Sequence, residues 1–525
     1  MAATTAFELS LLFVSSRSCT ILIEDGGVWE TARPYALTLN GESAGSADRC
    51  VHSLYGLLPD TAYTLTAACE GAEQTLTFTT AAECVTLDVR RFGALGDGCH
   101  DDTPAIQAAI LTCPDGGHVL VPAGDYRVGP LFLKSHMTLH LARGARLALR
   151  TEREAFPILP GIVRSDDGAR EDVFSLYEGN PLDTFAAAIT GMGVEDVRII
   201  GEGTVDGCAQ DGDWWQHTHT RTIAWRGNLF FLRGCKNIIV QGIHFANSPC
   251  WNLHPFMSEH LDFFNIEVTA PWNSPNTDAF DPESCRHVRL IGARLSVGDD
   301  CIALKAGKIW MGQTYGLPCE DIEIRQCLME DGHGAVTVGS EMAGGVKHVR
   351  VSQCLMRATD RGLRVKTRRG RGKNGVIDDI VFERVRMDHV KAPLVLNSLY
   401  YCDPDGHSDY VQCREKLPVD DRTPTIGTVV YRDVEAEGCE ACAAYLLGLP
   451  ERPVEEVRLE RCFFRFDPDA KPMVPAMADG VAPCALRGVI AGGVKKLVLD
   501  QVRMEGNQAP DVESDKETEV VRTGG

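Results

Sequence analysis

The chain has 525 residues, of which 44% are apolar and 24% charged, and its formal net charge at pH 7 is −21. This length and composition indicate a folded protein with a large core and room for more than one domain, and they exclude wholesale disorder. The strong negative charge argues against a general nucleic-acid binder and against docking on an anionic membrane. A local basic cluster could still hold an acidic substrate at short range.

No apolar run reaches the roughly 20 residues that a membrane helix needs. The N-terminal residues lack a basic segment, and the apolar run at residues 11–14 is too short for a secretion signal. We therefore expect a cytoplasmic protein. Its 20 cysteines show no paired spacing of metal ligands, so we expect reduced, buried thiols.

Residues 1–82 are predicted to form a small β-sandwich, because short alternating strands are separated there by turns. The phrase Leu57-Leu-Pro-Asp-Thr-Ala-Tyr-Thr-Leu65, followed by Phe78-Thr-Thr80, resembles a fibronectin type III module. The module is either a structural appendage or one end of a substrate cleft.

The pattern changes at Val85. The run Asp101-Asp-Thr-Pro-Ala-Ile106 predicts a short amphipathic helix with Thr103 as its N-cap and Pro104 at its first position. Such a helix would cap the open end of a stack of strands. Asp101 and Asp102 are expected to be structural, because carboxylates stabilise the start of a helix.

One pattern then recurs along the chain. Asp196-Val-Arg-Ile-Ile-Gly returns as Asn237-Ile-Ile-Val-Gln-Gly, His260-Leu-Asp-Phe-Phe-Asn and His287-Val-Arg-Leu-Ile-Gly, and later copies start at Asp321, His348, Asp379, Thr428, Glu456 and Lys496. Each copy is a strand, a bend and a second strand, which is typical of a β-solenoid. We expect this domain to span residues 85–506 and residues 507–525 to form a polar tail.

Four polar blocks interrupt the repeats: Asn276-Thr-Asp278, Gly298-Asp-Asp300, Gly332-His-Gly334 and Arg364-Val-Lys366. Neighbouring strands of a stack are about 4.8 Å apart, so the blocks would converge on one face. Close carboxylates repel, and at least one should keep a proton near neutrality. A protonated acid beside an ionised one is what glycosidic cleavage requires. The alternative interpretation of these acids is a calcium site or a set of surface charges.

The other side chains of the blocks suit the same chemistry. His333 lies between two glycines that permit close backbone approach, and it can hydrogen-bond one of the acids. Arg364 and Lys366 alternate around Val365 and should face the same side. With Lys305 and the run 368–373 they form a basic patch suited to a sugar carboxylate, although the run could also be a solvated charge cluster.

Together with Val338-Gly-Ser340, the four blocks resemble the signature motifs of the polygalacturonases, the pectin-degrading glycoside hydrolase family 28. The resemblance implies an all-β chain: a right-handed parallel β-helix of the pectate-lyase-like type, preceded by the fibronectin type III-like sandwich. It implies hydrolysis of α-1,4-galacturonosyl linkages with inversion at the anomeric carbon and without a metal or other cofactor.

The resemblance also implies residue roles. Asp299 would be the general acid, Asp278 and Asp300 would hold and deprotonate the attacking water, and His333 would support Asp299. The residues expected to bind the galacturonan substrate are Arg364, Lys366, Asn276, Lys305 and Tyr401.

Two further phrases, Gly339-Ser-Glu-Met-Ala-Gly-Gly345 and Lys366-Thr-Arg-Arg-Gly-Arg371, are similar to the bacterial exo-acting branch of the family. We expect an exo-polygalacturonase in which the inserts 150–190 and 307–320 close one end of the cleft. Four alternatives stay open: an endo-acting polygalacturonase, a hydrolase of another uronate-containing glycan such as rhamnogalacturonan, a calcium-dependent pectate lyase, and a non-catalytic carbohydrate-binding β-helix.

Overall fold

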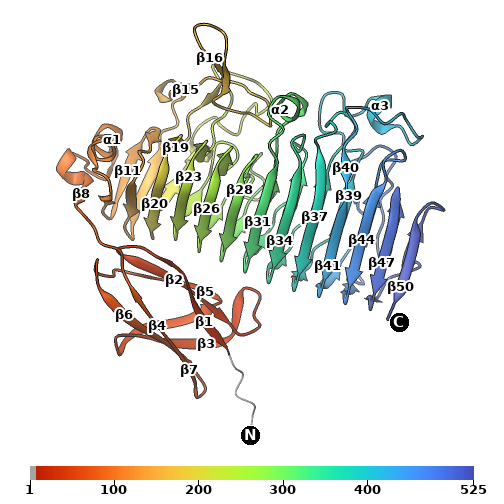
Figure 1. Ribbon diagram of the computed structural model, residues 1–525, viewed down its shortest axis with the longest axis horizontal. Coiled ribbons are helices and arrows are strands. Elements are labelled where there is room, and N and C mark those ends of the chain that lie inside the picture. The colour runs from red at the N-terminus through yellow and green to blue at the C-terminus, as the bar shows by residue number, and fades with distance from the viewer. Residues whose placement is uncertain (1–6, 525) are drawn as a thin grey trace.

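The computed structural model describes residues 7–524, which form a small antiparallel sandwich and a long stack of coils (Figure 1). Residues 1–6 of the predicted sandwich and residue 525 of the predicted tail lie outside the described residues. Across residues 7–524, no helix combines the length and hydrophobicity needed to cross a membrane.

The N-terminal sandwich has two antiparallel sheets. One contains β1 (Glu8–Val14), β2 (Ser18–Glu24) and β5 (Val51–Tyr55), and the other contains β3 (Glu30–Leu39), β4 (Glu42–Arg49), β6 (Ala62–Cys69) and β7 (Ala72–Thr79). Asn40 and Gly41, both at positive φ, make the tight hairpin turn between β3 and β4. Alternating side chains such as Leu37 and Leu65 meet between the sheets. The predicted sandwich is confirmed, whereas its fibronectin type III type stays a prediction.

The remainder of the chain is a right-handed parallel β-helix with three faces, as predicted. The strands of the first face are β8 (Thr86–Asp88), β10 (Gly117–Val121), β13 (Met137–Leu141), β20 (Glu195–Gly201), β23 (Lys236–Gln241), β26 (Glu259–Phe264), β28 (Arg286–Ile291), β31 (Cys319–Arg325), β34 (Val346–Ser352), β37 (Val376–Glu383), β40 (Thr425–Ile426), β41 (Thr428–Arg432), β44 (Val454–Glu460), β47 (Val494–Asp500) and β50 (Glu519–Thr523).

The second face follows the first around each coil. Its strands are β9 (Asp97–Asp101), β11 (Gly124–Val128), β14 (Ala145–Leu149), β21 (Thr204–Asp206), β24 (His244–Ala246), β27 (Glu267–Thr269), β29 (Arg294–Ser296), β32 (Leu328–Glu330), β35 (Leu355–Arg357), β38 (Arg386–Asp388), β42 (Glu435–Cys439), β45 (Phe463–Phe466) and β48 (Arg503–Glu505).

The third face consists of two sheets that the parallel bridges of Phe280, to Leu253 and to Ile302, join into one surface. Its strands are β12 (Leu131–Phe132), β19 (Ile189–Met192), β22 (Phe230–Arg233), β25 (Leu253–Phe256), β30 (Ile302–Leu304), β33 (Val336–Gly339), β36 (Arg361–Lys366), β39 (Ala392–Asn397), β43 (Cys442–Leu447), β46 (Arg487–Gly492) and β49 (Val512–Ser514).

Short helices and small hairpins lie in the loops between the strands of the coils. They are α1 (Thr103–Thr112), α2 (Ile309–Thr314), α3 (Asp409–Gln412), the 3-10 turns η1 (Val89–Phe92), η2 (Arg153–Ala155) and η3 (Ala209–Asp211), and the antiparallel pairs β15 (Ile158–Leu159) with β18 (Thr184–Phe185) and β16 (Ile162–Arg164) with β17 (Glu171–Val173).

The recurring sequence pattern corresponds to one position on every coil. Seven of the ten residues that start the repeats share the left-handed backbone conformation, with φ between 54° and 56°: Asp196, Asn237, His260, His287, Asp321, His348 and Asp379. Asp, Asn and His tolerate this conformation better than most residues, so they recur near the start of these strands of the first face. The residue that follows points inward, and aligned side chains such as Leu261, Val288 and Val349 are fully buried.

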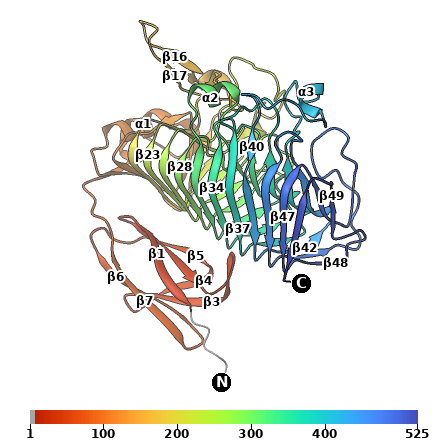
Figure 2. The same ribbon diagram turned by 45° about the vertical axis from the view of Figure 1, so that its right-hand side comes forward.

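The sandwich docks on the outside of the first face (Figure 2). An apolar cluster joins the two parts, with Phe13, Leu22, Cys50 and Val51 from the sandwich and Ile200, Phe264 and Ile291 from the β-helix. At its edge the buried Gln241 accepts a hydrogen bond from Ser18 Oγ at 2.5 Å and donates one to Thr20 Oγ1 at 2.8 Å. The sandwich therefore lies on a different face from the four polar blocks, which favours its interpretation as a structural part.

Two local predictions were wrong. The predicted polar tail contains β49 and β50, which pair with β46 and β47 and complete the last coil. Its sequence is polar because a terminal strand has one neighbour and leaves most of its side chains in solvent. Helix α1 does start at Thr103, but its N-cap is Asp102, and the Asp101 carboxylate accepts the Thr103 amide at 3.1 Å.

Candidate active site

The four polar blocks meet on the third face of the β-helix. Parallel pairing of β33 with β36 places Thr337 beside Arg364 and Gly339 beside Lys366. On its other side β33 pairs with β30 of the preceding coil, where Ile302 lies beside Val336. Val365 is fully buried in the core, so its two basic neighbours project outward, as their alternation predicts.

Three carboxyl groups lie together at the entry to these strands. One oxygen each from Asp278, Asp299 and Asp300 lies within 4.8 Å of the others. Asp278 belongs to one coil and the other two to the next, which is the convergence that the spacing predicts. The three groups differ in environment, because Asp278 and Asp300 are buried while the Asp299 side chain is 24% exposed.

Asp300 is the ionised member of the group. Lys366 Nζ lies 2.7 Å from one of its oxygens and Arg364 Nη1 lies 3.2 Å from the other. Burial alone would raise the pKa of Asp300, but the charges of Lys366 and Arg364 outweigh it and hold this pKa well below the usual range. The pKa values of both cations are raised in return, because the attraction of Asp300 outweighs their own burial.

Asp278 is the protonated member. Burial, followed by the nearby charge of Asp299, raises the pKa of Asp278 to about 8. The ammonium group of Lys305, 3.7 Å away, opposes this shift without cancelling it. Two carboxyls on neighbouring coils are thus held in opposite protonation states near neutrality, which is the condition for acid–base work on one bond.

Asp299 and His333 form the accessible pair. The imidazole Nδ1 lies 3.3 Å from an Asp299 oxygen, and the His333 side chain is 52% exposed. This hydrogen bond raises the pKa of His333, because the carboxylate stabilises the imidazolium. Asp299 is therefore the carboxyl that a ligand can reach, with a proton donor beside it.

The two glycines around His333 allow close packing. A Cβ on Gly332 would lie 2.7 Å from the Asp299 carbonyl oxygen, and one on Gly334 would lie 2.9 Å from Asp300 Oδ1. Neither glycine has positive φ, so their role is close approach rather than an unusual backbone conformation. Without a side chain at Gly334, the His333 coil can approach the buried carboxylate of the preceding coil.

The predicted substrate-binding cations are all in the site, but they are buried. Lys366 and Arg364 are 8% and 6% exposed, and Arg364 Nη2 lies 3.0 Å from the sulfur of Met477. Lys305 is 3% exposed, lies 3.4 Å from both Asp281 and Glu341, and sits 4.2 Å from the centre of the Trp251 ring.

Two other predicted contacts are occupied by protein partners. The Asn276 side-chain oxygen accepts a 2.7 Å hydrogen bond from Arg226. Tyr401 stacks on His407 with ring centres 4.4 Å apart. The ring of Tyr400, its neighbour in sequence, is the one that faces the catalytic cations, at 5.5 Å from Lys366 Nζ.

The basic run 368–373 consists of three buried arginines and one exposed lysine, Lys373, which pairs with the exposed Asp421. Its three arginines are buried in ion pairs: Arg369 holds Glu451 with two contacts of 2.6 and 2.8 Å, and Arg371 donates to Asp403 at 2.7 Å. They organise the loops beside the site and are not open to a substrate. The sequence could not distinguish a surface patch from buried pairs, because the acidic partners lie more than 30 residues away.

Sequence reasoning missed two buried acids of the site. Asp281 is fully buried beside Lys305, and burial together with the charge of Asp278 raises its pKa well above the usual range. Glu341 is 7% exposed, and the charges of Lys305 and Lys308 overcome its burial and lower its pKa. The signal for Asp281 was its place in an apolar run, three residues after Asp278.

The donor set does not fit a divalent cation. The oxygens of Asp278, Asp299 and Asp300 are close enough to share an ion. Calcium takes 6–8 oxygen ligands, yet here Lys366, Arg364 and Lys305 surround the two buried carboxyls and supply the positive charge. The calcium interpretation of the acids is therefore disfavoured by their cationic partners.

Known proteins have sequences and folds similar to those of this chain. The model of glycosyl hydrolases family 28 matches residues 118–461, and a rhamnogalacturonase A/epimerase, pectate lyase-like model matches residues 86–140. The chain is 31% identical over 442 residues to a Vitis vinifera protein called "Probable polygalacturonase", covering 81% of this chain and 84% of that protein.

Bacterial relatives include both a sequence and a solved structure. An "Exo-poly-alpha-D-galacturonosidase" of Dickeya chrysanthemi is 27% identical over 68% of this chain and 64% of its own length. The family 28 exopolygalacturonase structure of Yersinia enterocolitica has the same fold, with a TM-score of 0.72 at 18% identity, covering 99% of this chain and 98% of that one.

We expect Gly334→Ala to lower kcat roughly 100-fold. The new methyl group would lie 2.4 Å from Thr337 Oγ1 and 2.9 Å from Asp300 Oδ1, and both partners are buried and cannot move away freely. Displacing a catalytic group by about 1 Å costs on this order in rate. Steady-state kinetics on oligogalacturonides would measure the change. Gly492→Ala, whose methyl group meets no atom closer than 3.8 Å, is the matched control and should keep wild-type kinetics.

We expect Asp278→Asn to flatten the dependence of stability on pH. The pKa of Asp278 is about 8 in the folded chain and ~3.9 in an unfolded one, so the folded state binds the extra proton between these values. This stabilising contribution is full below pH ~4 and is lost as the pH rises toward 8. Melting temperatures recorded from about pH 5 to 8 should therefore fall less for the variant than for wild type. Parallel curves would show that Asp278 does not titrate there.

Proposed function

Because the chain belongs to glycosyl hydrolase family 28, we propose that it is a polygalacturonase that removes galacturonate from the non-reducing end of α-1,4-linked oligogalacturonides. The observation that carries the proposal is the Asp299–His333 pair, open to a ligand and placed beside an ionised Asp300 and a protonated Asp278. This arrangement suits a reaction in which one bond receives a proton while water is activated next to it.

In the proposed mechanism, Asp299 takes a proton from His333 and donates it to the glycosidic oxygen as the bond to the anomeric carbon breaks. His333, whose pKa is raised by its hydrogen bond to Asp299, keeps a proton beside that acid and can restore it after each turnover. As the water attacks the anomeric carbon, the ionised Asp300 accepts its proton, and the protonated Asp278 donates a hydrogen bond that orients the water. Arg364 and Lys366 keep Asp300 ionised and direct positive charge toward a uronate carboxylate.

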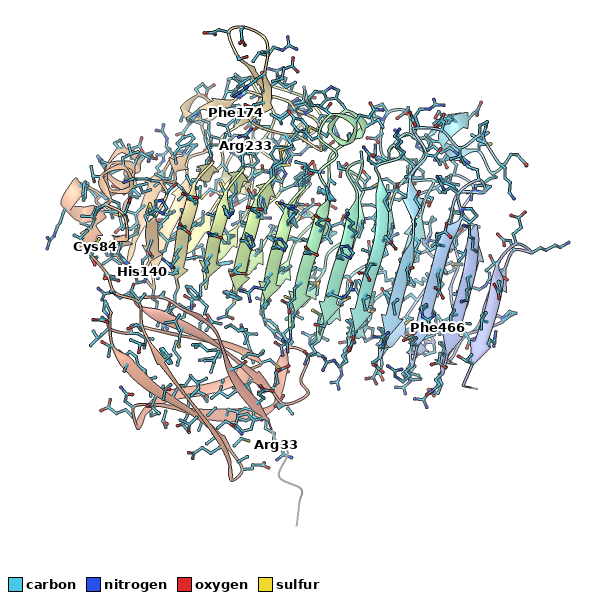
Figure 3. The ribbon with its side chains drawn as sticks, viewed as in Figure 1. Arg33, Cys84, His140, Phe174, Arg233 and Phe466 are labelled. Carbon is cyan, nitrogen blue, oxygen red and sulfur yellow. The ribbon has the colours of Figure 1, made fainter. Side chains whose placement is uncertain are left out.

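The exo preference is supported by the insert 150–190. Its hairpin is fixed to β22, since Arg233 donates to the Val173 carbonyl at 2.9 Å and covers the Phe174 ring at 5.1 Å (Figure 3). Gly179 of the same insert accepts a hydrogen bond from the Lys308 amide at 3.1 Å, and a Cβ there would lie 2.6 Å from Glu341. The insert thus contacts the second predicted insert at the edge of the acid cluster.

Arg226 links the insert to the Asn276-Thr-Asp278 block. Arg226 donates to the Tyr177 hydroxyl at 3.1 Å and to Asn276 Oδ1 at 2.7 Å, and Tyr177 stacks on Trp225 at 4.5 Å. These contacts favour a pocket for a chain end over a cleft that is open at both ends. An exo-acting enzyme needs such a closed end.

We expect wild-type enzyme to release saturated mono- or digalacturonate from the first minutes of incubation with defined oligogalacturonides. Asp299→Asn should lower kcat by roughly 1,000-fold, since general acid catalysis contributes about 10²–10⁴. Chromatography of products over time measures both. Asp115→Asn, which changes an exposed acid distant in sequence from the four polar blocks, is the control. A ladder of intermediate lengths would show that the enzyme is endo-acting. Cleavage of rhamnogalacturonan alone would show that rhamnogalacturonan, and not oligogalacturonide, is the substrate.

We expect the first product to have the inverted anomeric configuration, as the family resemblance implies. Inverting enzymes usually hold their carboxyl groups about 6.5–9.5 Å apart, whereas here the closest oxygens lie within 4.8 Å. A distance between the nearest oxygens does not measure the separation of the carboxyl groups, so the prediction rests on the family motifs and not on the distance. Proton NMR of the anomeric signal during the first turnovers decides between the two outcomes.

A further inference from the structure

An exposed indole lies in the loop that leads to the first of the four polar blocks. Trp272 is 76% exposed and is the most exposed large apolar side chain in the described part of the chain. It lies in the loop between β27 and the Asn276-Thr-Asp278 block. Leaving so large an apolar surface in water is unfavourable, and indoles at such positions commonly meet a ligand that has one apolar side.

The turn that presents Trp272 is held rigidly. The Pro271 carbonyl accepts hydrogen bonds from the Ser274 amide at 2.9 Å and from its hydroxyl at 2.6 Å. The same hydroxyl lies 2.6 Å from Thr277 Oγ1, which accepts the Gly298 amide at 3.2 Å. The turn is therefore fixed to the catalytic coil without using the indole.

Main-chain packing places the backbone of the Trp272 turn against the residue that precedes Asp299. A Cβ on Gly298 would lie 2.7 Å from the Pro271 carbonyl oxygen and 2.3 Å from that of Ser274. Pro271, the residue before Trp272, therefore packs against Gly298, and Gly298 is the residue before Asp299. Neighbouring coils are about 4.8 Å apart, so the loop that carries the indole lies one coil from the Asp299 backbone.

The direction along the coil axis fixes which sugar Trp272 can reach. Arg364 and Lys366 lie on the C-terminal side of Asp299, two coils further along the stack. Trp272 lies on the N-terminal side, on the coil of Asp278. The insert is linked to this same coil through Arg226, which donates to Tyr177 and to Asn276. A sugar bound on this coil, on the side away from Arg364 and Lys366, is therefore at the end to which the insert is linked.

We propose that Trp272 is the stacking platform for the terminal galacturonate, and this inference rests on the proposed function. The carbon–hydrogen face of the pyranose ring would lie on the indole, while its polar groups face the charged side of the pocket. Trp272 is thus a binding residue that sets the position of the bond to be broken and takes no part in proton transfer.

The test compares wild type, Trp272→Ala and Trp272→Phe on di- and hexagalacturonate. Because every substrate has a terminal sugar, Trp272→Ala should lower kcat/KM roughly tenfold on both lengths, which corresponds to ~1.4 kcal/mol. Trp272→Phe should restore part of the loss. Leu58→Ala, which removes a 61% exposed apolar side chain from the sandwich, is the control and should keep wild-type kinetics.

A second readout follows binding without turnover. In the Asp299→Asn background, digalacturonate should change the tryptophan fluorescence, and Trp272→Phe should abolish most of that change. Unchanged kinetics and an unchanged fluorescence response in the Trp272 variants would overturn the inference. A loss that grows with oligomer length would also overturn it, because it would place the ring on the leaving-group side. Wild-type enzyme that binds but never cleaves either oligomer would instead refute the proposed function.

Discussion

The register between parallel coils is the constraint on which the site depends. Hydrogen bonding fixes neighbouring strands about 4.8 Å apart and aligns Thr337 with Arg364 and Gly339 with Lys366. A slip of one residue in β36 would bury both cations in the core and expose Val365. The slip is opposed by the apolar residues that stack inward on every coil, so the energy of the core also holds the catalytic groups in line.

Within that frame, two similar carboxyls acquire opposite properties from their partners. Asp278 and Asp300 are both buried, and burial raises the pKa of each. Only Asp300 has a cation within hydrogen-bond distance at each oxygen, whereas Asp278 has Lys305 at 3.7 Å. The direction of each pKa shift is therefore set by the position of the cations and not by depth in the protein. A buried ion pair of this kind costs desolvation energy, and here its benefit is a defined charge state.

Much of the architecture could be predicted because it has a local signature. The bend residues of the repeats, such as His260 and His287, mark the coils, and the spacing of the acids implies their convergence. Features that depend on distant partners could not be predicted. The arginines near residue 370 find Glu451 and Asp403 only after folding, and β50 gains its identity as a strand from pairing with β47.

The same limit applies to single residues of the site. Tyr400 and Tyr401 are equivalent in sequence, yet only the backbone direction after β39 decides that Tyr400 faces the cations. Asp281 carried no motif of its own, and its importance follows from complete burial next to Lys305. In both cases the missing information is the direction of the side chain. Periodicity alone does not determine that direction at irregular turns.

The insert that contains α2 has a consequence for how such an enzyme can change. It lengthens the chain between Asp300 and His333, yet β30 and β33 remain direct neighbours. Distance in sequence and distance in space are thus independent at every bend of the stack. Loops of new length can be grafted at these bends to reshape the pocket while the acids stay in place, so the choice of substrate and the chemistry of cleavage can vary separately.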